Sequence, residues 1–266
     1  MPEPLFALLQ SRHQRIDPAI LRDVLVQDAG MPKVDAVRAS QKARGILDDR
    51  LTEAQAEACR ASLARQQVET FVLPAEKVAP QPRPPIIHWL GIGDGGLFVP
   101  TDYHGSGGVV PWSSVFVVSS GLVMTVVEER VPTEVWEGHG RDPTTKTRWD
   151  TRRKEEPHHI TEILGLSDAG QLLHFRLAAQ RLHAQQVPQG GAAASRFQKY
   201  LLLLDDVVAG ATQAEISPET RQILSERREK PREIEGKKAY VFDERGYDAY
   251  NRWLFQLFML REQGES

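Results

Sequence analysis

A short proline-rich segment near the first third of the chain limits how the polypeptide can fold. Between Pro80 and Pro85 there are four prolines in six residues. Such a segment is stiff and extended, and it does not lie inside a sheet because proline has no backbone N–H to donate. The chain has 266 residues, which is enough for two cores. We therefore predict a first domain over 1–79, a linker over 80–85 and a second domain over 86–266.

Helical signals dominate the part before the linker. Asp17 precedes Pro18, which is the pattern of an N-cap followed by a proline in the first turn. A second helix is predicted after it, and a third helix begins after Thr52 as its N-cap. The stretch 45–51 is interpreted as a connector, and 68–74 as a short strand because it holds β-branched and aromatic residues.

The part after the linker is rich in strand-forming residues divided by glycines. The stretch GIGDGGLF, from Gly91 to Phe98, resembles a phosphate-binding loop at first sight. A dinucleotide site needs a helix directly after the glycines, and here a strand-like run with Pro100 follows. Asp94-Gly95 between two apolar runs instead predicts a hairpin turn.

These strands and the helical segments after them predict the fold class. The strands favour an antiparallel sheet or small barrel. Helices are expected after Ser195 and Ser217, and an amphipathic helix over 246–263 closes the chain. The predicted class is α+β, with a small helical hairpin-plus-sheet domain followed by this sheet or barrel and C-terminal helices.

Composition excludes several classes of function. The formal net charge of −3 gives no strong nucleic-acid signal, because tight binding needs a basic excess. The single cysteine, Cys59, rules out a cysteine-based zinc site. No apolar run is long enough for a membrane span, and a cytoplasmic location is expected. No cofactor is predicted.

The histidines do not form a metal-binding motif, because no HExxH and no i, i+4 pair occurs. The best candidate for a metal site is His159 approaching His174 across a hairpin, with Glu162 near. An alternative function is that of a small-ligand binder or metal-dependent enzyme with its site at the barrel mouth. That site would use His88, Asp102 and His104.

The stretch 131–157 is the main candidate for a binding site. It is interpreted as a long connection with few core residues, and connections of this length are usually functional or disordered. Tryptophan and arginine dominate interface hot spots. The predicted partner-binding residues are Trp136, Arg148, Trp149, Arg152 and Arg153. A solvated hairpin excursion between two strands is the alternative interpretation.

Two resemblances bear on the fold. The stretch from Ala43 to Pro74 resembles the C-terminal domain of ribosomal protein L7/L12 in its apolar spacing. The positions that carry this resemblance are Gly45, Leu51, Ala54, Ala58, Leu63 and Val68. The run VVPWSSVFVVSSG, together with a closing helix around YNRWLFQL, resembles bacterial pleckstrin-homology-like (PH-like) domains. Chains with both features are similar to uncharacterised bacterial two-domain proteins, which implies a fold rather than a function.

The sequence thus predicts a non-enzymatic protein that binds a protein partner or acts as a scaffold. A homo-oligomer is left open. A third class, binding at a membrane surface, follows from the PH-like resemblance and would need a basic patch on one loop rim.

Overall fold

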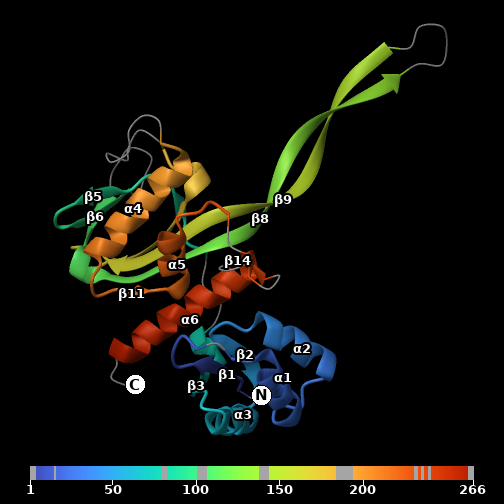
Figure 1. Cartoon of the computed structure of the whole chain (residues 1–266), viewed down its shortest axis with the longest axis vertical. Helices are drawn as coiled ribbons and strands as arrows, with labels where there is room; N and C mark the ends of the chain where they lie inside the picture. Colours follow the sequence, from blue (N-terminus) through green and yellow to red (C-terminus); the bar gives the residue numbers. More distant parts are fainter. Residues whose placement is uncertain are drawn as a thin grey trace.

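The computed structural model describes residues 4–14, 16–78, 83–100, 107–137, 144–183, 194–230, 233–234, 237–238 and 241–262. It has an N-terminal α/β part, a larger part built on a mixed sheet, and a long two-stranded arm that leaves the larger part (Figure 1). The predicted α+β class is confirmed. Among the described residues, no helix is long and apolar enough to cross a membrane.

The N-terminal part has three helices and a three-stranded antiparallel sheet of order β2-β1-β3. Its elements are β1 (Phe6–Gln10), α1 (Pro18–Gln27), α2 (Lys33–Lys42), β2 (Ile46–Leu51), α3 (Glu53–Arg65) and β3 (Thr70–Pro74). The predicted helices and the strand over 68–74 are confirmed. The prediction of a connector over 45–51 is wrong, because these residues form β2 and pair with β1. Leu47 and Leu51 are buried in that strand, so tertiary packing decided its conformation.

Side-chain caps fix the starts of two helices as the sequence predicts. The Asp17 carboxylate accepts a hydrogen bond from the N–H of Ala19 at the start of α1. Thr52 and Gln55 form a reciprocal capping box at the start of α3.

The hairpin predicted from GIGDGG is confirmed. Strand β5 (Gly91–Gly93) pairs with β6 (Gly96–Pro100), and β6 pairs with β7 (Gly107–Pro111). Gly93 lies opposite Gly96, so Asp94 and Gly95 form the turn. A Cβ atom on Gly96 would lie 2.2 Å from the carbonyl oxygen of Val110, so the third strand requires a glycine there.

The main sheet has the order β11-β8-β9-β10-β4, with β14 also paired to β8. Its strands are β4 (Ile86–Ile87), β8 (Val115–Glu137), β9 (Thr144–Leu166), β10 (Leu172–Ala178), β11 (Glu215–Ile216) and β14 (Val241–Asp243). The prediction of a barrel is wrong, because this sheet is open. It is also mixed rather than antiparallel, since the short strands β4, β11 and β14 pair in parallel with their neighbours.

Helices cover the two faces of this sheet. They are α4 (Arg196–Gly210), α5 (Pro218–Glu226) and α6 (Glu244–Glu262). Strands β12 (Glu233–Ile234) and β13 (Lys237–Lys238) form a separate antiparallel pair. The N-caps predicted at Ser195 and Ser217 are confirmed.

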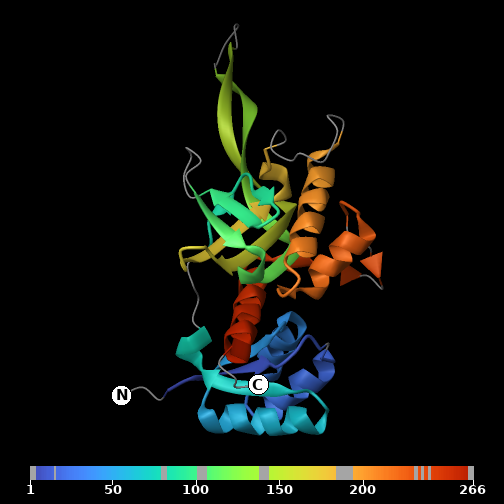
Figure 2. The ribbon, with the colours of Figure 1, turned by 90° about the vertical axis from the view of Figure 1, so that its left-hand side faces the viewer.

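Helix α6 joins the N-terminal part to the main sheet. It lies between them in both ribbon views (Figure 2). The indole N–H of Trp253 donates to the carbonyl oxygen of Gln10 at 2.7 Å, while the Tyr247 hydroxyl donates to the carbonyl oxygen of Ser119 at 2.8 Å. One hydrophobic cluster accordingly includes Leu9 from β1, Val123 from β8 and the apolar side of α6. The division of the chain at 80–85 stays a prediction.

Candidate functional site

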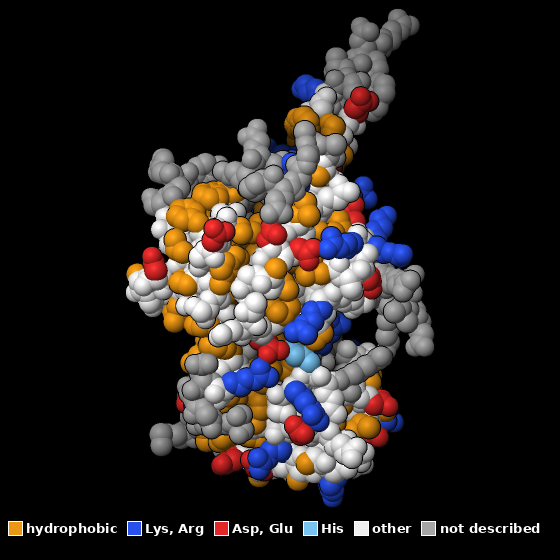
Figure 3. Space-filling model, turned by 60° about the vertical axis from the view of Figure 1, so that its left-hand side comes forward, with side chains coloured by type: hydrophobic (Ala, Val, Ile, Leu, Met, Phe, Trp, Pro, Cys, Tyr) orange, Lys and Arg blue, Asp and Glu red, His pale blue; other side chains and the backbone are white. Residues whose placement is uncertain are grey.

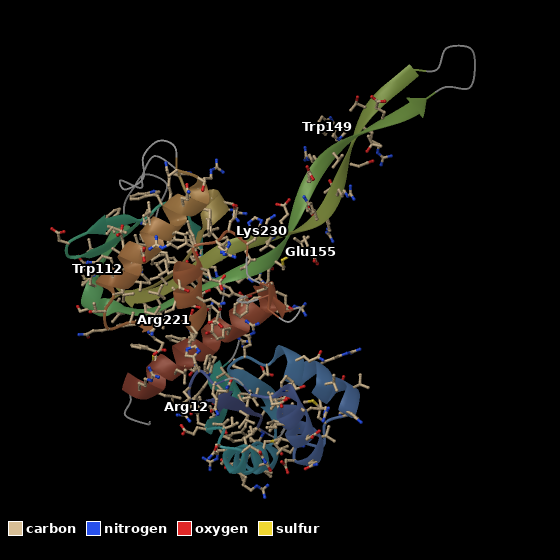
Figure 4. The ribbon with its side chains drawn as sticks, viewed as in Figure 1. Arg12, Trp112, Trp149, Glu155, Arg221 and Lys230 are labelled. Atoms are coloured by element: carbon tan, nitrogen blue, oxygen red, sulfur yellow. The ribbon has the colours of Figure 1, made fainter. Side chains whose placement is uncertain are left out.

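The arm is the part of β8 and β9 that extends beyond the rest of the sheet. The two strands pair antiparallel from Val115 to Glu137, but β14 reaches β8 only as far as Met124 and β10 reaches β9 only from Ile160. Among the described residues, 125–137 and 144–159 therefore form a ribbon of two strands with no third neighbour. Figure 4 shows Trp149 midway along this arm and Glu155 nearer its base.

The interpretation of 131–157 as a structureless connection is wrong for its described residues. They continue two strands of the main sheet. The stretches VPTEVW and TTKTRW are rich in threonine, valine and tryptophan, which favour strands. This composition could have predicted β-strands in place of a connection. The described residues of this stretch pair as two antiparallel strands, as the alternative of a hairpin excursion predicts; the choice between that alternative and partner contact stays a prediction.

Four of the five predicted partner-binding residues lie on β9 in the arm. Arg148 and Arg152 share one face of the ribbon, whereas Trp149 and Arg153 share the other, because side chains alternate along a strand. Trp136 lies in β8, and its side chain is outside the described residues. The structure thus brings the four residues to one strand but divides them between two faces.

These side chains are exposed and only partly paired. The Trp149 side chain is 63% exposed, which is unusual for a large apolar residue. Arg153 contacts Glu128 at 3.1 Å and Arg148 contacts Asp150 at 3.1 Å, both on the surface. Arg152 forms no ion pair with any residue that the structure describes. Figure 3 shows basic, acidic and apolar side chains close together along the arm.

A second polar cluster lies inside the main sheet, where α6 covers it. The Glu162 carboxylate on β9 is 5% exposed and accepts hydrogen bonds from Arg176 at 2.6 Å and from Asn251 at 2.9 Å. His174 lies 2.6 Å from its other oxygen, and Arg176 also reaches Asp248 at 2.7 Å. Sequence reasoning noticed Glu162 and His174 but missed Asp248 and Asn251, which lie on α6 and are distant in sequence. It also missed Arg176, which lies two residues after His174 and therefore on the same face of β10.

The chemistry of this cluster is that of a closed ion-pair network. Burial alone would lower the pKa of the Arg176 guanidinium, but the neighbouring carboxylates of Glu162 and Asp248 raise it. Each charge therefore has a partner, as buried charges require. A small cavity borders the network, and two buried oxygens that line it, Ser119 Oγ and Asn251 Oδ1, have no hydrogen-bond partner among the described residues. We interpret the network as the anchor of α6 on the sheet.

The pairing of His159 with His174 as metal ligands is wrong. His174 lies opposite Leu164 and shares the face of Glu162, whereas His159 has the opposite parity on β9 and contacts Phe197 of α4. The sheet separates the two rings. No group of three potential ligands suited to a metal ion occurs within the described part of the chain.

The other proposed ligand site is only partly visible. The His88 ring stacks on His183, with centroids 5.4 Å apart, and its Nδ1 lies 3.3 Å from the carbonyl oxygen of Arg181. Asp102 and His104 lie outside the described residues. His88 therefore contacts the segment after β10, and there is no barrel mouth for it to line.

Comparison with known proteins assigns this chain to no family. No family model, no curated protein and no solved structure matches this chain. The class that the structure defines is an α+β protein with a mixed open sheet and a protruding two-stranded arm.

Proposed function

We propose that this chain is a non-enzymatic interaction or scaffold protein that binds a protein partner through the arm. The observation that carries the proposal is the 63% exposed Trp149 on a ribbon that extends away from the body. An isolated two-stranded ribbon is only marginally stable in water, so its strands gain from a further contact. Arg153 shares the face of Trp149, and Arg148 and Arg152 lie on the opposite face; arginine, like tryptophan, is enriched at interface hot spots.

The test compares the wild-type chain with an arm variant and a matched control in affinity purification. Trp149→Ala combined with Arg152→Ala should lose a partner that the wild type retains, and its melting temperature should not fall, because both side chains are exposed. Leu172→Ala is the control. It removes a half-exposed apolar side chain from β10, outside the arm, and should therefore leave partner binding unchanged. If the arm variant retains every partner of the wild type, the proposal is wrong. The cytoplasmic location expected from the sequence remains a prediction.

A further inference from the structure

The two outer edges of the arm are not equivalent. In an antiparallel pair, opposite residues alternate between pairs that exchange backbone hydrogen bonds and pairs whose backbone groups point to the outer edges. Pro132 lies opposite Trp149 and Pro157 lies opposite Met124. Proline has no N–H to give to the partner strand, so both pairs belong to the second kind. The backbone groups of Trp149 therefore point to the outer edge of β9, and the period of two gives the same direction to those of Thr151.

Proline blocks one edge and leaves the other open. Pro132 lies in the middle of the β8 edge, where a further strand would find no N–H. The β9 edge has no proline from Thr144 to Glu156. An unpaired strand edge of this kind is a template for pairing with another chain.

The side chains along β9 select an acidic occupant. One face of the strand has four basic and two acidic residues, and the acidic residues contact Arg148 and Lys154. This face consists of Lys146, Arg148, Asp150, Arg152, Lys154 and Glu156. The other face presents Trp149, Thr151, Arg153 and Glu155.

We propose that the partner adds an acidic extended segment to the outer edge of β9 as a third strand of the arm. Its Asp or Glu side chains would alternate along the basic face, and an apolar side chain would lie beside Trp149. This inference rests on the proposed function, and it specifies the chemistry of the partner. A third strand would also supply the neighbour that the two-stranded ribbon lacks.

A second copy of the chain fits the edge less well. Its β8 carries Glu128 and Glu129, which complement β9 in charge. That strand would have to pair through the edge that Pro132 interrupts, which removes a hydrogen bond from the middle of the new ladder. Self-association is therefore a result that would contradict the proposal.

The test uses the full chain and a labelled peptide of about ten residues in which glutamate alternates with threonine and valine, a length that matches the open edge. Fluorescence anisotropy measures its affinity. Thr151→Pro removes an N–H that points outward, so the arm keeps its own ladder, as it does at Pro132 and Pro157. We expect the affinity to fall by about tenfold or more. Val126→Pro makes the same change at an outward position of β8 and should leave the affinity within about twofold.

A second variant and a second peptide keep the test decisive if Thr151→Pro disturbs the arm. Arg152→Glu should lower the affinity for the peptide by a similar factor, and a peptide with the same charges but a central proline should not compete with it.

Equal binding of the proline peptide or of a single-stranded oligonucleotide would show charge attraction without strand addition and would overturn the inference. So would unchanged affinity in Thr151→Pro, or a dimer of the wild-type chain that excludes the peptide. If the peptide does not bind but Trp149→Ala combined with Arg152→Ala still loses a partner, only this inference fails; if neither effect occurs, the proposed function fails with it.

Discussion

Replacing Gly45 with alanine tests the junction between the N-terminal part and α6. Gly45 has a φ of +82°, and a Cβ atom there would lie 2.1 to 2.4 Å from ring atoms of Trp253. That ring is 1% exposed and its N–H is bonded to the carbonyl oxygen of Gln10, so it has little freedom to move. Residues in this part of φ space other than glycine cost about 1–2 kcal/mol, and overpacking a core adds about 1–3 kcal/mol. The expected loss in free energy of unfolding is therefore about 2–5 kcal/mol.

Gly30 supplies the matched control. Its φ is +66°, but nothing lies within 4 Å of a Cβ atom built on it. Gly30→Ala should therefore lower the free energy of unfolding only by the cost of the backbone conformation, about 1–2 kcal/mol. The difference between the two variants, about 1–3 kcal/mol, isolates the contact with Trp253. In a chain of this size it corresponds to a further fall in melting temperature of roughly 2–12 °C.

Urea unfolding of both variants, alone and in a Trp253→Ala background, measures this contact directly. Removing the ring should relieve the overpacking. In that background, Gly45→Ala should therefore lower the free energy of unfolding only by the cost of the backbone conformation. The reasoning is refuted if Gly45→Ala is no more destabilising than Gly30→Ala, or if its cost is unchanged when the ring is absent.

Two further predictions concern the interior. Glu162→Ala leaves the buried Arg176 without one of its carboxylates and should lower the free energy of unfolding by about 3–5 kcal/mol in urea titrations; a loss below about 1 kcal/mol would contradict the ion-pair network. Burial lowers the pKa of His13 and of His159 below the value of an exposed histidine. Their neutral forms therefore contribute full stability above about pH 6.5, and this contribution is lost as the pH falls through the lowered values in the folded chain. Urea midpoints should decrease as the pH falls from about 7 to about 5, and the decrease should be smaller in His13→Gln combined with His159→Gln; an equal decrease in both chains would contradict this assignment.

Local signals in the sequence predicted most of the helices and the glycine hairpin. Caps such as Thr52 and turns such as Asp94-Gly95 act within a few residues, so their effect can be recognised without the fold. Strand β2 was missed because its stability comes from β1 and from the burial of Leu47 and Leu51, which are long-range contacts. The parallel pairing at the borders of the main sheet was missed for the same reason, since a two-residue strand such as β11 takes its conformation from its neighbour.

The candidate site was predicted in part. The side chains on β9 were recognised by type, since tryptophan among arginines is informative without a structure. Their division between two faces depends on the strand conformation, and the prediction of a loop concealed it. The Glu162 network could not be assembled from sequence, because its members come from β9, β10 and α6.

The positions of the two prolines connect the arm to the body of the protein. Pro132 and Pro157 both fall on outward positions of one register, and that register continues without interruption from the arm to Val117 in the main sheet. The main sheet is held by α6 and by the Glu162 network, so the alignment of the arm is fixed inside the core and not at its exposed end. A shift of one residue would require one of the two strands to turn over. If β9 turned, Trp149 would move to the opposite face and Pro157 would lie where its strand must donate a hydrogen bond; if β8 turned, Pro132 would lie in such a position. The buried network and the exposed edge therefore depend on the same strand pairing: the core sets the register that leaves the backbone of Thr151 available to a partner.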